Sequence, residues 1–151
     1  IHCRQNCGGG RMSARLGGCL CGAVRFEIAP FKPGFGACHC KMCQRWAGSA
    51  LLALTVPGDT LTVSGEAVKT YNSSDWAERS FCGKCGAGLW YKVKDEDIYH
   101  IAIGLLDDTT GLTLKSEIFH DLKPDCFELS ASSKKYTTAE TMAMFAPKEP
   151  E

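Results

Sequence analysis

Apolar and polar residues alternate along much of the chain, and this period of two is typical of strands. Val24, Phe26 and Ile28 alternate with Arg25 and Glu27, as in a strand that buries one face. Further strands are predicted at residues 49–56, 61–64, 67–71, 79–82, 88–93 and 98–103. Proline, glycine and aspartate separate these segments at spacings of about 8–12 residues, which favours an all-β fold with mainly antiparallel strands.

Two short helices are predicted outside the strands, at residues 41–46 and 139–145. The Met and Phe side chains of the second helix are expected to cover the core rather than to line a cofactor site. Residues 1–11 have no periodicity and precede Met12, and we interpret them as a disordered leader or a cloning-derived arm. Residues 12–151 are then expected to form a single domain.

The charge balance excludes one broad class of function. The 151 residues contain 17 Lys and Arg and 17 Asp and Glu, so the formal net charge is zero. Proteins that bind nucleic acid by neutralising phosphates need a clustered positive excess, so we expect no nucleic-acid partner. No apolar run approaches the roughly 18–20 residues of a membrane-spanning helix, and we expect no membrane association.

Ten cysteines are the main chemical feature of the chain. A cysteine-rich protein uses its thiols either in disulfides or as ligands of a soft metal. Residues two apart in an extended chain point to opposite faces and are hard to join by a disulfide, so close spacing favours metal ligands. With no apolar secretory signal in residues 1–11, it also favours a reducing, cytoplasmic location. The closely spaced motifs are Cys19 and Cys21, then Cys38, Cys40 and Cys43, then Cys82 and Cys85.

The most economical pairing of these motifs gives two zinc sites. The first and last motifs together supply four thiolates for a closed structural site, and Gly83 and Gly86 suit the tight turn of a zinc knuckle. The middle motif supplies three ligands, the number found where zinc keeps one position open for a substrate. We therefore predict a structural zinc at the outer motifs and a catalytic zinc at Cys38, Cys40 and Cys43.

Other arrangements stay open at this point. The pair Cys82 and Cys85 has the spacing of a thioredoxin-type redox motif, although the glycines that follow disfavour the helix that such a motif opens. The middle motif can instead belong to a second structural zinc with a fourth ligand from elsewhere. Spacing alone does not decide which motifs share an ion. The candidate fourth ligands are His39, His100, His120 and Cys126.

Four segments carry a family resemblance: GCLCGAVRF at residues 18–26, CHCxxCQRWxGS at 38–49, FCxxCGxxL at 81–89 and GLLDD at 104–108. In this order they resemble the glutathione-dependent formaldehyde-activating enzyme family, also called the centromere protein V domain family. The resemblance covers residues 17–129. Many members carry His near the position of Glu117 and Trp near that of Cys126, so the chain departs from the family pattern there.

The resemblance implies a fold, two metal sites and an activity. The fold would be the zinc-stapled β-tent that the family shares with methionine sulfoxide reductase B. The activity would be that of a carbon–sulfur lyase that adds glutathione to formaldehyde. The implied ligands of the structural zinc are Cys19, Cys21, Cys82 and Cys85, and those of the catalytic zinc are Cys38, Cys40 and Cys43.

Thiol chemistry supplies a mechanistic hypothesis for the second zinc. A free thiol is mostly protonated at neutral pH, and coordination to zinc converts it to a thiolate that can attack formaldehyde or a related small electrophile. Zinc with three thiolates carries a net charge of −1, and a guest thiolate makes it −2. Lys41, Arg45 and the backbone N–H groups of Gly48 and Ser49 are the predicted residues that bind glutathione and offset this charge.

Two further expectations complete the sequence analysis. Asp107 and Asp108 are predicted to be turn residues that satisfy backbone amides of their own loop. The alternative function is a non-catalytic zinc module that acts as a thiol carrier or an interaction domain. A fourth protein ligand at the middle motif would favour that module, and a vacant position would favour an enzyme or carrier.

Overall fold

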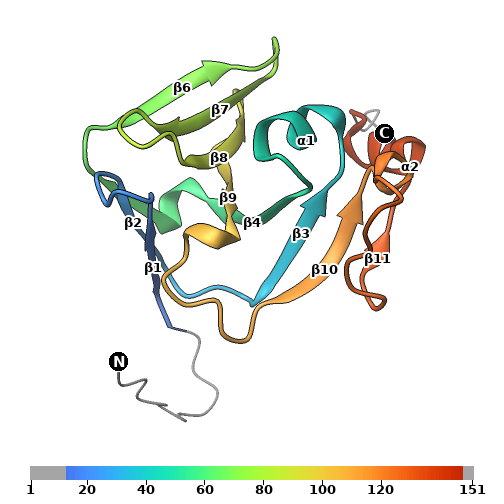
Figure 1. Cartoon of the computed structure of the whole chain (residues 1–151), viewed down its shortest axis with the longest axis horizontal. Helices are drawn as coiled ribbons and strands as arrows, with labels where there is room; N and C mark the ends of the chain where they lie inside the picture. The colour runs from blue at the N-terminus through green and yellow to red at the C-terminus, as the bar shows by residue number, and fades with distance from the viewer. Residues whose placement is uncertain (1–12, 148–151) are drawn as a thin grey trace.

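Two β-sheets make up most of the molecule, and two short helices accompany them (Figure 1). The structure is a computed structural model that describes residues 13–147, so the arm expected at residues 1–11 lies outside the described residues. The three strands of the smaller sheet lie in the order β1 (Arg15–Gly18), β2 (Arg25–Ile28) and β5 (Leu61–Ser64). The eight strands of the larger sheet lie in the order β11 (Lys134–Lys135), β10 (Thr113–Ile118), β3 (Gly34–Cys38), β4 (Leu51–Pro57), β9 (Ile98–Ala102), β8 (Gly88–Val93), β7 (Ala77–Cys82) and β6 (Val68–Asn72).

Antiparallel pairing dominates both sheets. Among the strands of residues 13–147, the parallel pairs are those that β10 forms with β3 and with β11. The prediction of an all-β, mainly antiparallel fold is therefore confirmed. Strands β5 and β8 begin and end at the predicted residues, whereas the other predicted strands differ from the prediction at their ends.

The sequence pattern does not predict strands β1, β3, β10 and β11. Strands β1 (RLGG) and β3 (GFGAC) are rich in glycine, which has a low strand propensity. Strand β10 buries Glu117 rather than an apolar residue, so its inward face has no hydrophobic signature. Strand β11 consists of two lysines and is defined by its pairing with β10 alone. Pairing with neighbouring strands, rather than local sequence preference, therefore determines that these four segments are extended.

The hydrophobic core joins the two sheets. Val24, Phe26 and Ile28, which alternate along β2 and the residue before it, are all buried. They belong to one cluster with Leu54 of β4 and Ile101 of β9 from the larger sheet. The alternation seen in the sequence is therefore the inner face of the smaller sheet.

Helix α1 (Lys41–Ala47) lies between two parts of the larger sheet, and it confirms the helix predicted at 41–46. In Figure 1, strands β7 and β8 stand on one side of α1 and strands β3 and β10 on the other. The helix begins after the cap residue Cys40 and ends at Gly48, whose φ of 78° is in the left-handed region. The segment 38–48 thus contacts both halves of the sheet.

Helix α2 (Thr138–Phe145) is present as predicted, but the expectation that its apolar residues cover the core is wrong. Met142, Met144 and Phe145 are 59%, 48% and 69% exposed. The buried residue is Thr141, whose hydroxyl accepts from the Phe119 N–H at 3.1 Å and donates to the Thr137 carbonyl at 2.7 Å. The helix docks through a polar residue, which apolar periodicity does not reveal. No helix within residues 13–147 is long and apolar enough to cross a membrane.

Short 3₁₀ turns connect the strands at η1 (Gly58–Thr60), η2 (Ile103–Leu105) and η3 (His120–Leu122). The loop after η2 ties the two sheets together, because the Asp107 N–H donates to the Leu16 carbonyl at 2.9 Å. The Arg25 guanidinium also donates to the Asp107 carboxylate and holds the pKa of that group below its usual range. Asp108 accepts from the Thr110 N–H at 2.8 Å and is a turn residue as predicted, whereas the Asp107 side chain pairs with β2.

Candidate metal centres

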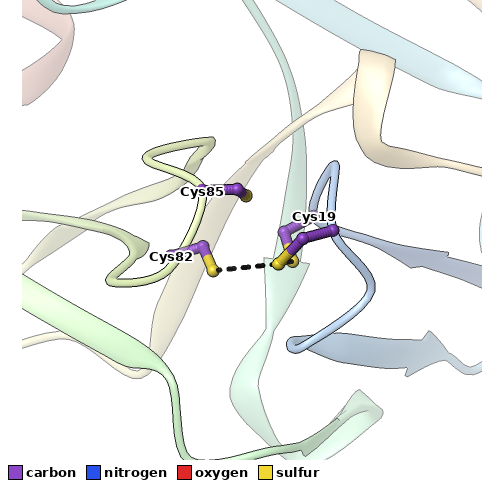
Figure 2. Close-up of side chains that lie close together, drawn as sticks. Cys19, Cys82 and Cys85 are labelled. Atoms are coloured by element: carbon purple, nitrogen blue, oxygen red, sulfur yellow. Dashed lines mark hydrogen bonds between the residues drawn. The ribbon is translucent and has the colours of Figure 1, made fainter.

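The four-cysteine cluster, consisting of Cys19, Cys21, Cys82 and Cys85, lies between the two sheets. Its sulfur atoms all lie within 4.8 Å of one another. The Sγ of Cys21 is 3.6 Å from that of Cys19 and 3.9 Å from that of Cys82. Figure 2 shows the loop that carries Cys82 and Cys85 facing the loop that carries Cys19. The sulfurs of two loops distant in sequence thus converge on one point.

Glycines shape both loops of this cluster. Gly22 and Gly86 have φ values of 79° and 77°, a region that residues with a Cβ rarely adopt. In each loop the glycine N–H donates to the carbonyl of the first cysteine, from Gly22 to Cys19 at 3.2 Å and from Gly86 to Cys82 at 2.8 Å. The hydrogen bond spans three residues in the first loop and four in the second, and each turn brings a pair of sulfurs to the cluster.

The three-cysteine cluster, consisting of Cys38, Cys40 and Cys43, lies at the junction of β3 and α1. Cys38 ends β3, Cys40 caps α1, and Cys43 is buried in the first turn of the helix. The Cys43 backbone N–H donates to the Cys40 Sγ at 3.3 Å, which satisfies one of the free amides of the helix start. The three sulfurs lie within 4.8 Å of one another.

No fourth His, Cys, Asp or Glu within residues 13–147 joins the three-cysteine cluster. His39, which lies between two of the cysteines in sequence, instead contacts Glu117 at 2.8 Å, and both side chains are fully buried. Cys126 is exposed. His100 lies beside Thr55 and Tyr91. The His120 ring packs against the His39 ring, with 5.8 Å between the ring centroids. None of the four candidate fourth ligands belongs to the three-cysteine cluster.

The thiols of each cluster are electrostatically unequal. Hydrogen bonds from the Cys38 and Cys43 thiols lower the pKa of Cys40 to about 2, and its contact with Cys40 raises the pKa of Cys38. In the four-cysteine cluster, burial opposes ionisation of Cys19. Hydrogen bonds from the Val24 N–H and the neighbouring thiols nevertheless lower its pKa to about 6. One sulfur in each cluster therefore takes a negative charge first, as a metal ligand must.

Arg79 of β7 is the main residue of the site that sequence analysis does not identify. Its side chain donates to the Cys43 Sγ at 3.4 Å and to the Ser73 hydroxyl at 2.6 Å, and it is only 3% exposed. The Trp46 and Tyr91 rings lie 5.6 and 4.9 Å from the guanidinium carbon. A lone arginine three residues before Cys82 has no sequence signal that separates it from a surface charge, because only the fold brings β7 to α1.

The predicted glutathione-binding residues lie along and just after α1. Lys41 and Arg45 are exposed, and neither side chain forms a hydrogen bond or ion pair within the part of the chain that the structure describes. Gly48 donates its N–H to the Gln44 carbonyl at 2.9 Å and ends the helix. The Ser49 hydroxyl donates to the Ala50 carbonyl at 3.1 Å. Their role in binding stays a prediction.

Glu117 anchors the loop of the three-cysteine cluster to β10. Besides contacting His39, its carboxylate accepts from the Ser133 hydroxyl and lies 3.4 Å from the Lys135 ammonium. Gln44 of α1 donates to the His39 carbonyl at 2.6 Å and holds the same loop from the other side. Position 117, where the chain departs from the family pattern, therefore supports the loop that carries Cys38 and Cys40.

The comparison with protein families agrees with this geometry. The family model described as glutathione-dependent formaldehyde-activating enzyme matches residues 14–121, which include both cysteine clusters. The chain belongs to this family. The fold also matches a crystal structure of a Rhodobacter sphaeroides protein with a TM-score of 0.54 and 23% identity, over 81% of this chain and 99% of that one.

Two curated relatives of the formaldehyde-activating enzyme family are each 30% identical to the chain. One is an uncharacterized lyase of Schizosaccharomyces pombe, matched over 127 residues that span 83% of this chain and 93% of the relative. The other, from Halomonas elongata, is named "Putative glutathione-dependent formaldehyde-activating enzyme" and is matched over 126 residues, 76% of this chain and 80% of the relative.

Proposed function

We propose that the protein is a zinc-dependent carbon–sulfur lyase that activates glutathione for addition to formaldehyde or a related small aldehyde. Membership of the formaldehyde-activating enzyme family and the lyase name of one relative support this reaction class. The observation that carries the proposal is the three-cysteine cluster, which no other protein ligand completes within residues 13–147. Three ligands and one open position are the arrangement of a zinc site that meets a substrate.

Both clusters fit zinc by the chemistry of their donor atoms. All seven side chains offer sulfur, which a borderline-soft ion such as zinc binds well and which magnesium and calcium do not favour. The four-cysteine cluster supplies the full tetrahedral set of a structural site. The three-cysteine cluster leaves one position for a guest thiol. Zinc bound there would hold such a thiol as a thiolate at neutral pH.

The residues of the chain would then position the reacting sulfur. The guest thiol loses its proton to solvent, its sulfur lone pair forms the new bond to the aldehyde carbon, and the carbonyl electron pair moves to oxygen. The oxygen takes a proton, which gives S-hydroxymethylglutathione, and the lyase reaction is the reverse. The cap position of Cys40 and the buried place of Cys43 fix two of the three sulfurs on α1, so the site is rigid before the guest arrives.

Zinc content and glutathione-dependent formaldehyde consumption, measured in Cys40→Ser, test this function. The wild-type chain should hold two zinc ions and consume formaldehyde only when glutathione is present. Cys40→Ser should lose one ion and on the order of 100-fold of its activity. Cys126→Ser is the matched control, because Cys126 is exposed and belongs to neither cluster.

Two outcomes would contradict the proposed function. Full activity in Cys40→Ser despite the loss of one ion would make the three-cysteine cluster a structural site. Binding of zinc and glutathione by the wild-type chain without turnover of any aldehyde in a panel would identify a thiol carrier instead of a lyase.

A further inference from the structure

Arg79 is a buried cation that has no carboxylate partner among the residues that the structure describes. None of the ion pairs within residues 13–147 involves it, and its Nε is buried without a hydrogen-bond partner. A buried charge is costly unless an opposite charge compensates it. The Cys43 sulfur lies 3.4 Å from Nη2, and as a thiolate ligand of a bound metal it would be the negative group beside Arg79.

The surroundings of Arg79 hold the guanidinium in this place. Strand β7 pairs Arg79 with Tyr91 on β8, and the Tyr91 ring lies 4.9 Å from the guanidinium carbon. The Trp46 ring of α1 lies at 5.6 Å. A Cβ at Gly88 would come within 3.1 Å of that ring, so the glycine leaves room for Trp46 beside β8. Aromatic rings on two elements thus orient one cation toward one sulfur.

Charge arithmetic shows what this cation does for a guest ligand. A divalent ion with three thiolates has a net charge of −1, and the guanidinium brings the local sum to zero. A guest thiolate then lowers the local net charge only to −1, whereas without Arg79 the net charge would be −2. Charges interact strongly in a site of low dielectric constant, so the positive charge of Arg79 weakens the repulsion between the cluster and an anionic guest.

We propose that Arg79 is a positioning residue that compensates the charge of the three-cysteine cluster and so lets it accept an anionic thiolate guest. The inference rests on the proposed function, in which a metal at this cluster binds a thiol. The sequence suggested that Lys41 and Arg45 compensate this charge, but both side chains are exposed. The inference assigns that role to Arg79 of β7, which is buried. A thioether such as S-methylglutathione forms no thiolate, so its sulfur gains nothing from Arg79.

Cobalt binding tests the inference, because Co²⁺ reports its thiolate ligands in its absorption spectrum. The variants are Arg79→Met and Arg79→Gln, which remove the charge, and Arg79→Lys, which keeps it. Lys94→Met is the matched control, since it removes a positive charge from an exposed residue of the β8–β9 turn. The four-cysteine cluster is an internal control, because its Co²⁺ affinity reports a correctly folded chain.

We expect the neutral variants to bind Co²⁺ at the three-cysteine cluster on the order of 10- to 100-fold more weakly than the wild-type chain. Arg79→Lys should recover part of this loss, and the four-cysteine cluster and Lys94→Met should keep wild-type affinity. In the cobalt-loaded wild type, glutathione should change the spectrum and S-methylglutathione should not. The glutathione affinity should fall in the neutral variants by a further factor of the same order.

The outcomes separate this inference from the proposed function. If a neutral variant with an intact four-cysteine cluster keeps wild-type Co²⁺ and glutathione affinities, Arg79 has no charge role and the inference is overturned while the proposed function stands. If wild type does not bind glutathione, the proposed function fails and the thiolate-guest inference falls with it, whatever happens to Co²⁺ affinity. If Arg79→Met loses the four-cysteine site, the polar Arg79→Gln decides the comparison.

Discussion

Glycine at a few turn positions decides whether the cysteine sulfurs can converge. Gly86 has a φ of 77°, and the space where its Cβ would lie is open. Alanine there would meet no neighbour, so its cost would be the strain of the left-handed conformation alone. Conformation rather than packing therefore selects glycine in the loop of Cys82 and Cys85.

We predict that Gly86→Ala lowers the free energy of unfolding by about 1–2 kcal/mol and weakens metal binding at the four-cysteine cluster. Gly104→Ala is the matched control, because Gly104 also has open space at its Cβ but no positive φ. Urea unfolding of the two variants would check the difference. Equal stability of both would show that the loop relaxes without strain.

Some residues of the candidate site could be predicted from the sequence and others could not. The close spacing of the cysteines within each motif could be read from the sequence, and the pairing of the first and last motifs was the most economical choice; the structure brings the same groups of four and three sulfurs together. Arg79 could not be identified, since its contact with Cys43 spans 36 positions and depends on how the sheet bends. Glu117 could not be assigned to His39 for the same reason, their separation being 78 positions.

At the scale of elements, a buried contact between two polar side chains joins β10 to the loop between β3 and α1. His39 and Glu117 are both fully buried, and Glu117 also binds Ser133 and lies near Lys135 of β11. Replacing Glu117 takes the carboxylate away from the His39 ring and the Ser133 hydroxyl, which stay buried. A buried polar group that loses its partner destabilises the fold more than an apolar pair of the same shape would. The loop of Cys38 and Cys40 depends on this contact for its position.

Glu117→Gln should therefore lower the free energy of unfolding by about 3–5 kcal/mol and reduce metal affinity at the three-cysteine cluster. Glu128→Gln serves as control, because the Glu128 side chain is 73% exposed. Chemical denaturation and a double-mutant cycle with His39→Gln measure the coupling. Additive effects of the two substitutions would show that the pair does not act as a unit.

Element prediction succeeded where side-chain alternation coincides with burial, as in β2, and at the helix after the cysteines. It failed for β3, whose glycines carry no strand signal, and for the docking face of α2, where Thr141 rather than Met142 is buried. In these segments hydrogen bonds and neighbouring strands, not hydrophobic pattern, determine the structure.

At the scale of the whole molecule, the four-cysteine cluster connects the two sheets. Cys19 and Cys21 lie between β1 and β2 of the smaller sheet, whereas Cys82 ends β7 of the larger sheet and Cys85 lies between β7 and β8. A metal bound there would act as a cross-link between them, whereas one at the three-cysteine cluster would bind within the β3–α1 segment. A metal at the four-cysteine cluster should therefore stabilise the fold more than a metal at the three-cysteine cluster.

We predict that Cys85→Ser lowers the melting temperature of the zinc-loaded protein more than Cys43→Ser does. Structural zinc contributes roughly 10 kcal/mol or more to the folding of small zinc peptides, and part of that contribution would be lost with the cross-link. Thermal unfolding with and without a chelator measures both effects. If chelation leaves the melting temperature of the wild type unchanged, the sheets are held together by the core alone.

The first turn of α1 depends on the chemical state of the Cys40 sulfur. This sulfur closes the first turn of the helix through the Cys43 amide and also belongs to the cluster. Peroxide or an alkylating agent that modifies this sulfur would thus remove the cap of the helix and one of the three sulfurs of the cluster at the same time. Oxidation of the three-cysteine cluster would then be visible as a local change of shape, which a protease or an antibody that recognises native α1 could detect.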